Sequence, residues 1–128
     1  MDAWRISASG MTAQWKRMRV IASNVSHADS TSTPGGGPYR KQYPVFSTTL
    51  SEVNGVSYRG SRDARNATRT VHAPDSPRAD EQGRVTKPNV SLAMQSKDMM
   101  SARRAYQANV RAMAQFKKLC RKTLNLKG

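Results

Sequence analysis

The chain has 128 residues, of which 22 are lysine or arginine and 8 are aspartate or glutamate, so its formal net charge is +14 at pH 7. This charge indicates an anionic partner: nucleic acid, an anionic membrane or an acidic protein. Only 37% of the residues are hydrophobic, so we expect part of the chain to order only against partners. No apolar run is long enough to insert into a membrane or to form a cleaved signal peptide, which by itself predicts a cytoplasmic protein.

The first segment, residues 1–28, has the seven-residue apolar repeat of a helix that pairs with another helix. The predicted pairing seam consists of Trp4, Ala8, Met11, Trp15, Met18, Ala22 and Val25. A second apolar stripe on the far side of the helix consists of Ile6, Gly10, Ala13 and Val20. Because a surface helix is usually polar on its outer side, two apolar faces predict two packing partners. Gly10 costs the helix about 1 kcal/mol relative to alanine.

The middle segment, residues 29–88, is polar and rich in turn-forming residues. No helix is compatible with its opening run, "DSTSTPGGGPYR". One or two strands are predicted for "YRKQYPVFSTTLSEV", with Pro44 at a sheet edge or a break. Asn54-Gly55 in "VNGV" predicts a tight hairpin turn. Residues 61–83 are almost wholly polar and predict a long loop, and "GRVTKP" predicts one more short strand.

The last segment, residues 89–128, predicts a second long helix from about Ser91 to Leu126. Its apolar seam consists of Met99, Ala102, Tyr106, Asn109, Met113, Phe116 and Cys120. Asn109 is polar on this seam and is predicted to fix the register of the helix pair. The predicted fold is therefore mainly α with a small β-rich insert. The two terminal helices pair as a coiled coil and form one core domain, with the insert at one end.

Sites for catalysis are poorly supported, because the chain has only two histidines, His27 and His72, and one cysteine. We predict no enzyme, no cofactor and no metal site, and we interpret Cys120 as a small core residue without a disulfide partner. Three basic residues, Arg104, Arg111 and Lys118, recur every seven residues opposite the seam. They form either a solvated face or a contact with an acidic neighbour. A basic nucleic-acid-binding protein and a secreted coiled-coil adaptor that does not polymerise remain alternative functions.

Several blocks resemble the flagellar axial and rod protein family. These are "ISASGMTAQWKRMRVIASNVSHADSTST", "PGGGPYRKQ", "VNGV", and "PNVS" followed by "DMMSARRAYQANVRAM". The resemblance covers about residues 1–60 and 71–128. It implies a structural subunit of the proximal rod, which polymerises into a helical periplasmic drive shaft that transmits torque. It also implies export by the flagellar type III system without a cleaved signal peptide, which replaces the cytoplasmic expectation.

The resemblance further implies partners and an order of folding. The partners are other copies of the chain, other proximal and distal rod proteins, the rod–export-gate adaptor, the export apparatus and the surrounding ring proteins. The terminal segments are expected to be disordered in the monomer and to become paired helices on assembly. Neighbouring subunits would then contact a set of residues outside the seam: Ile6, Gly10, Ala13, Val20, Arg104, Arg111 and Lys118. Asn24 would cap or bend the chain where the first helix ends.

Overall fold

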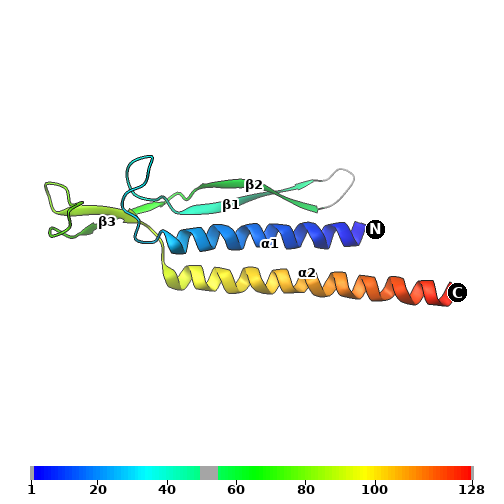
Figure 1. The fold of residues 1–128 in the computed structure, drawn as a ribbon. Helices are drawn as coiled ribbons and strands as arrows, with labels where there is room; N and C mark the ends of the chain where they lie inside the picture. The colour runs from blue at the N-terminus through cyan, green and yellow to red at the C-terminus, as the bar shows by residue number, and fades with distance from the viewer. Residues whose placement is uncertain (1, 50–54, 128) are drawn as a thin grey trace. The chain divides into compact units, whose positions relative to one another are not determined.

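The computed structural model describes residues 2–49 and 55–127, and it is mostly helical with two short antiparallel strand pairs (Figure 1). In chain order the elements are α1 (Asp2–Ser26), β1 (Gln42–Thr49), β2 (Gly55–Asp63), β3 (Thr68–His72), β4 (Arg84–Pro88) and α2 (Leu92–Lys127). The chain forms two compact units. The first contains residues 1–18, 44–60 and 100–128, and the second contains residues 19–43 and 61–99.

The two long terminal helices predicted from the seven-residue repeat are confirmed. The helix α1 ends two residues before the expected position, and both ends of α2 lie one residue after the expected positions. Neither helix contains a proline. The helix α2 starts after Pro88 with Ser91 at its N-cap, where the Ser91 hydroxyl accepts a hydrogen bond from the Met94 backbone N–H at 3.4 Å.

In the first unit, α1 contacts both α2 and β2. The rings of Trp4 and Phe116 lie 6.4 Å apart, and Gly10 lies against Asn109, so α1 and α2 run antiparallel where they meet. On another side of α1, the Val56 backbone N–H donates a hydrogen bond to Ser9 Oγ at 3.1 Å. The β1–β2 part of the insert therefore lies against α1 in this unit, in addition to α2.

The strands β1 and β2 form a two-stranded ribbon, which is stabilised on one face by the ring contact of Phe46 with Tyr58 at 5.9 Å. Each strand of such a ribbon has one side without a hydrogen-bonded neighbour. Pro44, which cannot donate a ladder hydrogen bond, is therefore tolerated in β1. The tight turn predicted at Asn54-Gly55 lies partly outside the described residues.

In the second unit, β3 and β4 pair antiparallel from Thr68 opposite Pro88 to His72 opposite Arg84. The strand predicted for "GRVTKP" is confirmed as β4. The long loop predicted for residues 61–83 is wrong in part, because residues 61–63 continue β2 and residues 68–72 form β3. Val71 is the only apolar residue of β3, and the two threonines of the strand add only methyl groups. The strand therefore has no hydrophobic pattern of its own. It is held by pairing with β4, whose Val85 is fully buried.

Candidate functional site

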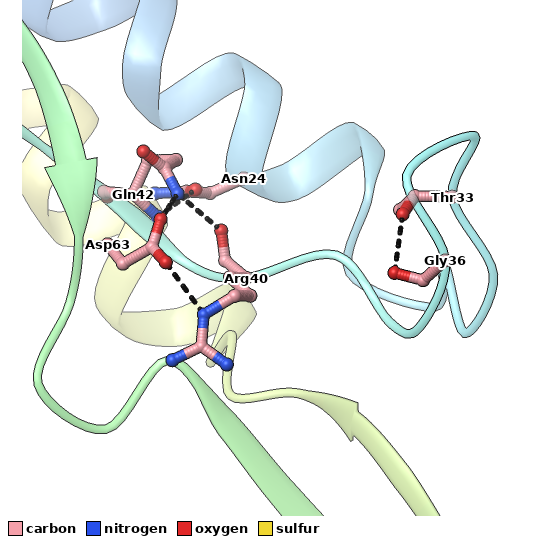
Figure 2. Close-up of polar contacts among 6 residues, drawn as sticks. All are labelled: Asn24, Thr33, Gly36, Arg40, Gln42 and Asp63. Carbon is pink, nitrogen blue, oxygen red and sulfur yellow. Dashed lines mark hydrogen bonds and ion pairs between the residues drawn. The ribbon is translucent and has the colours of Figure 1, made fainter.

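A buried polar cluster at the end of α1 connects three elements of the second unit by hydrogen bonds (Figure 2). The side chain of Asn24 is only 2% exposed. Its Oδ1 accepts hydrogen bonds from Tyr39 Oη and from the Gln42 backbone N–H, each at 2.9 Å. Its Nδ2 donates to the Gln42 carbonyl at 2.8 Å and lies 3.5 Å from Gln95 Oε1. Asn24, which was expected to cap or bend the chain where the first helix ends, connects α1 to β1 and to the first turns of α2.

The partners of Asn24 could not be predicted from the sequence. Tyr39, Gln42 and Gln95 are separated from Asn24 by 15 to 71 positions, and no local pattern connects them. Ser23 Oγ and the His27 ring also contact Tyr39, at 3.2 Å and with ring centroids 4.6 Å apart. A signal was nevertheless present, because an asparagine on an apolar helix face requires hydrogen-bond partners when it is buried.

An exposed ion pair lies next to this cluster (Figure 2). Asp63 at the end of β2 accepts a hydrogen bond from the Gln42 side chain at 2.5 Å and one from Arg40 Nε at 2.7 Å. These two hydrogen bonds hold the pKa of the Asp63 carboxyl below its usual range, the bond from Gln42 contributing most. The pair connects the segment before β1 with the end of β2.

An open apolar groove of about 510 Å³ lies in the first unit, between α1 and α2. Its lining consists of Ala8, Met11, Thr12, Trp15, Tyr106 and Met113. Except for Thr12, all of these residues belong to the predicted pairing seam. Trp15 is 48% exposed, and Lys16 Nζ lies 5.4 Å from the centroid of its ring. The groove presents apolar area that residues 2–49 and 55–127 leave uncovered.

The predicted seam is therefore only partly closed within the chain. Its buried or half-buried members are Ala8, Met11, Met18, Met99, Ala102, Tyr106, Asn109, Met113 and Phe116. Trp4, Trp15, Ala22 and Val25 are exposed. Trp4 nevertheless contacts Phe116 of α2, and Trp15 lines the groove together with Tyr106 and Met113.

Cys120 is exposed, and its assignment as a core residue is wrong. The antiparallel pairing places Phe116 opposite Trp4, close to the first residues of α1. The helix α2 continues past this contact to Lys127, and residues 117–126 are all exposed. Cys120 keeps the seven-residue spacing of the seam, but no α1 residue among those described lies opposite it.

Two members of the second apolar stripe of α1, Ala13 and Val20, are covered by the chain itself, which corrects their assignment to contacts with neighbouring subunits. Ala13 is 4% exposed and Val20 is 8% exposed. Ala13 lies on the same helix face as Ser9 and Lys16, and both of these contact β2. Two packing partners for α1 were correctly expected, but the second one is the chain's own insert.

Gly10 also faces its own chain. A Cβ added to Gly10 would lie 2.8 Å from Asn109 Nδ2 and 2.9 Å from its Oδ1. The missing side chain thus makes room for an amide of α2, and Asn109 Nδ2 donates a hydrogen bond to the Ala105 carbonyl at 3.0 Å. Among the other residues expected to contact neighbours, Ile6, Arg104, Arg111 and Lys118 are exposed and remain accessible.

Within residues 2–49 and 55–127, no three histidine, cysteine, aspartate or glutamate side chains gather in a group that could hold a metal ion. None of the helices in these residues is long and apolar enough to cross a membrane.

Comparison with known proteins identifies the chain's relatives. A family model described as flagellar basal body rod FlgEFG protein C-terminal matches residues 81–126. The flagellar basal-body rod protein FlgC of Escherichia coli O6:H1 is 36% identical over 98% of this chain and 96% of the relative. The FlgC proteins of Salmonella typhimurium and Agrobacterium fabrum are 35% and 34% identical, and the matches cover 98% and 97% of this chain and 96% and 92% of those proteins. The chain belongs to the FlgC family of flagellar basal-body rod proteins.

Proposed function

We propose that this structural rod subunit of the flagellar basal body acts in the proximal rod and has no active site. Its near full-length similarity to proteins named flagellar basal-body rod protein supports this assignment. Its partners are other flagellar rod components. In the proposed assembly, subunits polymerise by helix packing into a helical periplasmic drive shaft that transmits torque.

The open groove beside Trp15 is the observation that carries the packing proposal. We infer that a helix of a neighbouring rod subunit fills it. Aromatic side chains bury about 150–250 Å², so covering the exposed half of Trp15 would contribute roughly 2.5 kcal/mol at about 25 cal/mol per Å². A contact between a groove on one subunit and a different surface on the next is heterologous and builds helical assemblies rather than closed dimers.

The small core supports the expectation that the terminal segments order on assembly. The buried hydrophobic residues described are mainly alanine and valine: Ala13, Val20, Ile21, Ala67, Val85, Val90 and Ala102. Such side chains bury little apolar area, so neighbouring subunits would supply much of the stability. A marginally stable chain also suits export in an unfolded state by the type III system without a cleaved signal peptide. The export apparatus, the rod–export-gate adaptor and the surrounding ring proteins are further proposed partners.

Replacing Trp15 tests the proposal. The variant Trp15→Ala, expressed in cells without their own copy of the protein, should keep its helix content by circular dichroism but fail to build complete rods, as seen by electron microscopy of purified basal bodies. Tyr43→Ala is the matched control, because Tyr43 is also an exposed aromatic residue, at 44%, and does not line the groove. Complete rods built from Trp15→Ala subunits would contradict the role of the groove.

A further inference from the structure

Three basic side chains form a line along α2. Arg104, Arg111 and Lys118 are all exposed, and we call them the basic stripe. Residues seven apart on a helix lie about 20° apart around its axis and about 10.5 Å apart along it. The stripe points away from Asn109 and Phe116, which contact α1. It therefore stays accessible when α1 and α2 are paired.

The described part of the chain offers the basic stripe no opposite charge. The helix α2 carries one carboxylate, Asp98, and no acidic residue follows it. Ion pairs among the described residues join Arg40 to Asp63 and Arg84 to Asp80, and neither involves the stripe. A solvated helix usually alternates charges of opposite sign at four-residue spacing, which stabilises it. A single-sign stripe lacks this stabilisation, which indicates that its charges serve an external contact.

No helix or described strand of a second copy can supply the missing charges. Each helix has a single carboxylate, Asp2 in α1 and Asp98 in α2, and the described strands have none apart from Asp63 in β2. No element of this chain can therefore place carboxylates opposite all members of the stripe. A helix that carries the complement must therefore come from a different protein.

The neighbours of the stripe distinguish a protein partner from nucleic acid and from lipid. Between its members, the same face of α2 carries the exposed residues Gln107, Ala108, Ala114 and Gln115. None of them has an aromatic ring on which a base could stack. The exposed Leu119 lies beside Lys118 at one end of the stripe, but none of these four residues between the three cations has a large apolar side chain that could enter a lipid surface. Small and neutral residues between charges instead allow close approach of another helix.

We propose that the basic stripe docks a helix of a different protein of the rod assembly, one that carries carboxylates at the same seven-residue spacing. This inference rests on the proposed function, because it concerns which rod component meets α2. Two helices packed side by side present heptad-spaced positions to each other every two turns, so each cation meets one carboxylate. Such pairs accelerate and orient association, and their effect falls as the salt concentration rises.

Two synthetic helical peptides of identical composition test the spacing. One carries a glutamate every seven residues along one face, and the other carries the same glutamates spread around the helix. Binding to the purified full-length chain is measured by fluorescence anisotropy at low salt and at about 150 mM salt, where charges are screened beyond about 8 Å. We expect the spaced peptide to bind about tenfold more tightly, as three surface pairs of ordinary strength would give. Equal binding of the two peptides would overturn the proposal.

Charge-matched variants test the stripe itself. The triple variant Arg104→Ala, Arg111→Ala, Lys118→Ala should lose the preference for the spaced peptide. The control triple variant Arg103→Ala, Lys117→Ala, Arg121→Ala removes the same charge from exposed positions elsewhere around the helix and should keep the preference. Equal loss in both variants would show an effect of net charge alone and would overturn the proposal.

Duplex DNA and vesicles of anionic phospholipid serve as parallel probes. We expect the stripe variant and its control to lose the same small amount of affinity for each of them, because both variants carry the same net charge. A loss specific to the stripe variant on DNA or vesicles would overturn the proposal in favour of that ligand. These measurements use purified protein, so their failure would leave the groove and rod assembly to be judged by the Trp15→Ala experiment.

Discussion

Gly10 and Asn109 give a sharp test of how α1 and α2 meet in the first unit. A Cβ at Gly10 would lie 2.8 Å from Asn109 Nδ2, a separation that real Cβ contacts essentially never show. The Asn109 amide is also held by its hydrogen bond to the Ala105 carbonyl. Even the smallest side chain at position 10 therefore forces Asn109 to move or the helices to separate.

The expected free energies follow from two opposing effects. Replacing glycine by alanine in a helix stabilises it by about 1 kcal/mol, whereas overpacking a close contact costs about 1–3 kcal/mol. We expect Gly10→Ala to lower the free energy of unfolding by about 0–2 kcal/mol. In the Asn109→Ala background the space is free, so the same substitution should raise it by about 1 kcal/mol. The coupling between the two sites is then about 1–3 kcal/mol.

Urea unfolding followed by circular dichroism measures this cycle on four chains: the wild type, the two single variants and the double variant. An osmolyte that favours the folded state, such as trimethylamine N-oxide, raises the folded population where the isolated chain is only partly ordered. If Gly10→Ala stabilised the chain equally in both backgrounds, Asn109 would not be its steric neighbour, and the pairing of α1 with α2 at this point would be refuted.

Three further predictions concern other sites. Asn24→Ala leaves the Gln42 backbone without its buried side-chain partner, so the free energy of unfolding in urea should fall by about 2–4 kcal/mol. The control variant Ser26→Ala, at an exposed position, should change this free energy by less than about 0.5 kcal/mol. The folded-state pKa of Asp63 is lowered, chiefly by the Gln42 side-chain hydrogen bond. The contribution of Asp63 to the free energy of unfolding is therefore complete above about pH 4 and is lost as the pH falls through the folded pKa. Asp63→Asn should reduce the acid dependence of stability, and an unchanged pH profile would argue against the ion pair. The exposed thiol of Cys120 should react with Ellman's reagent in the native chain at a rate within about tenfold of that in urea. Strong protection of the thiol would show that Cys120 is buried.

The sequence was sufficient to locate the helices because their seven-residue repeats are long and prolines or turn residues bound them. The same repeats could not identify what covers each face. Ala13 and Gly10 share an apolar stripe, but one lies on the side of β2 and the other meets α2. An apolar position shows that a surface is covered, and only the tertiary arrangement shows by what.

The β-rich insert was less predictable for a different reason. In β3 the burial comes from pairing with β4, so the strand itself reads as a polar loop apart from Val71. The polar cluster at Asn24 depends on residues that are distant in sequence, and such contacts leave no periodic signal. Cys120 followed the heptad spacing but lies where α2 extends beyond its contact with α1, and spacing alone carries no information about the length of the partner helix.

The polar cluster at Asn24 has a consequence for the order in which the chain folds. Its contacts with Gln42 close a loop of 18 positions, whereas its contact with Gln95 closes one of 71. Two doublings of loop length add about 1.2 kcal/mol of closure entropy, and contacts between distant segments form more slowly. We expect α1 to join the start of β1 first and the beginning of α2 to dock last. A subunit on its way into the rod would then hold its insert in place while α2 is still free to meet another molecule.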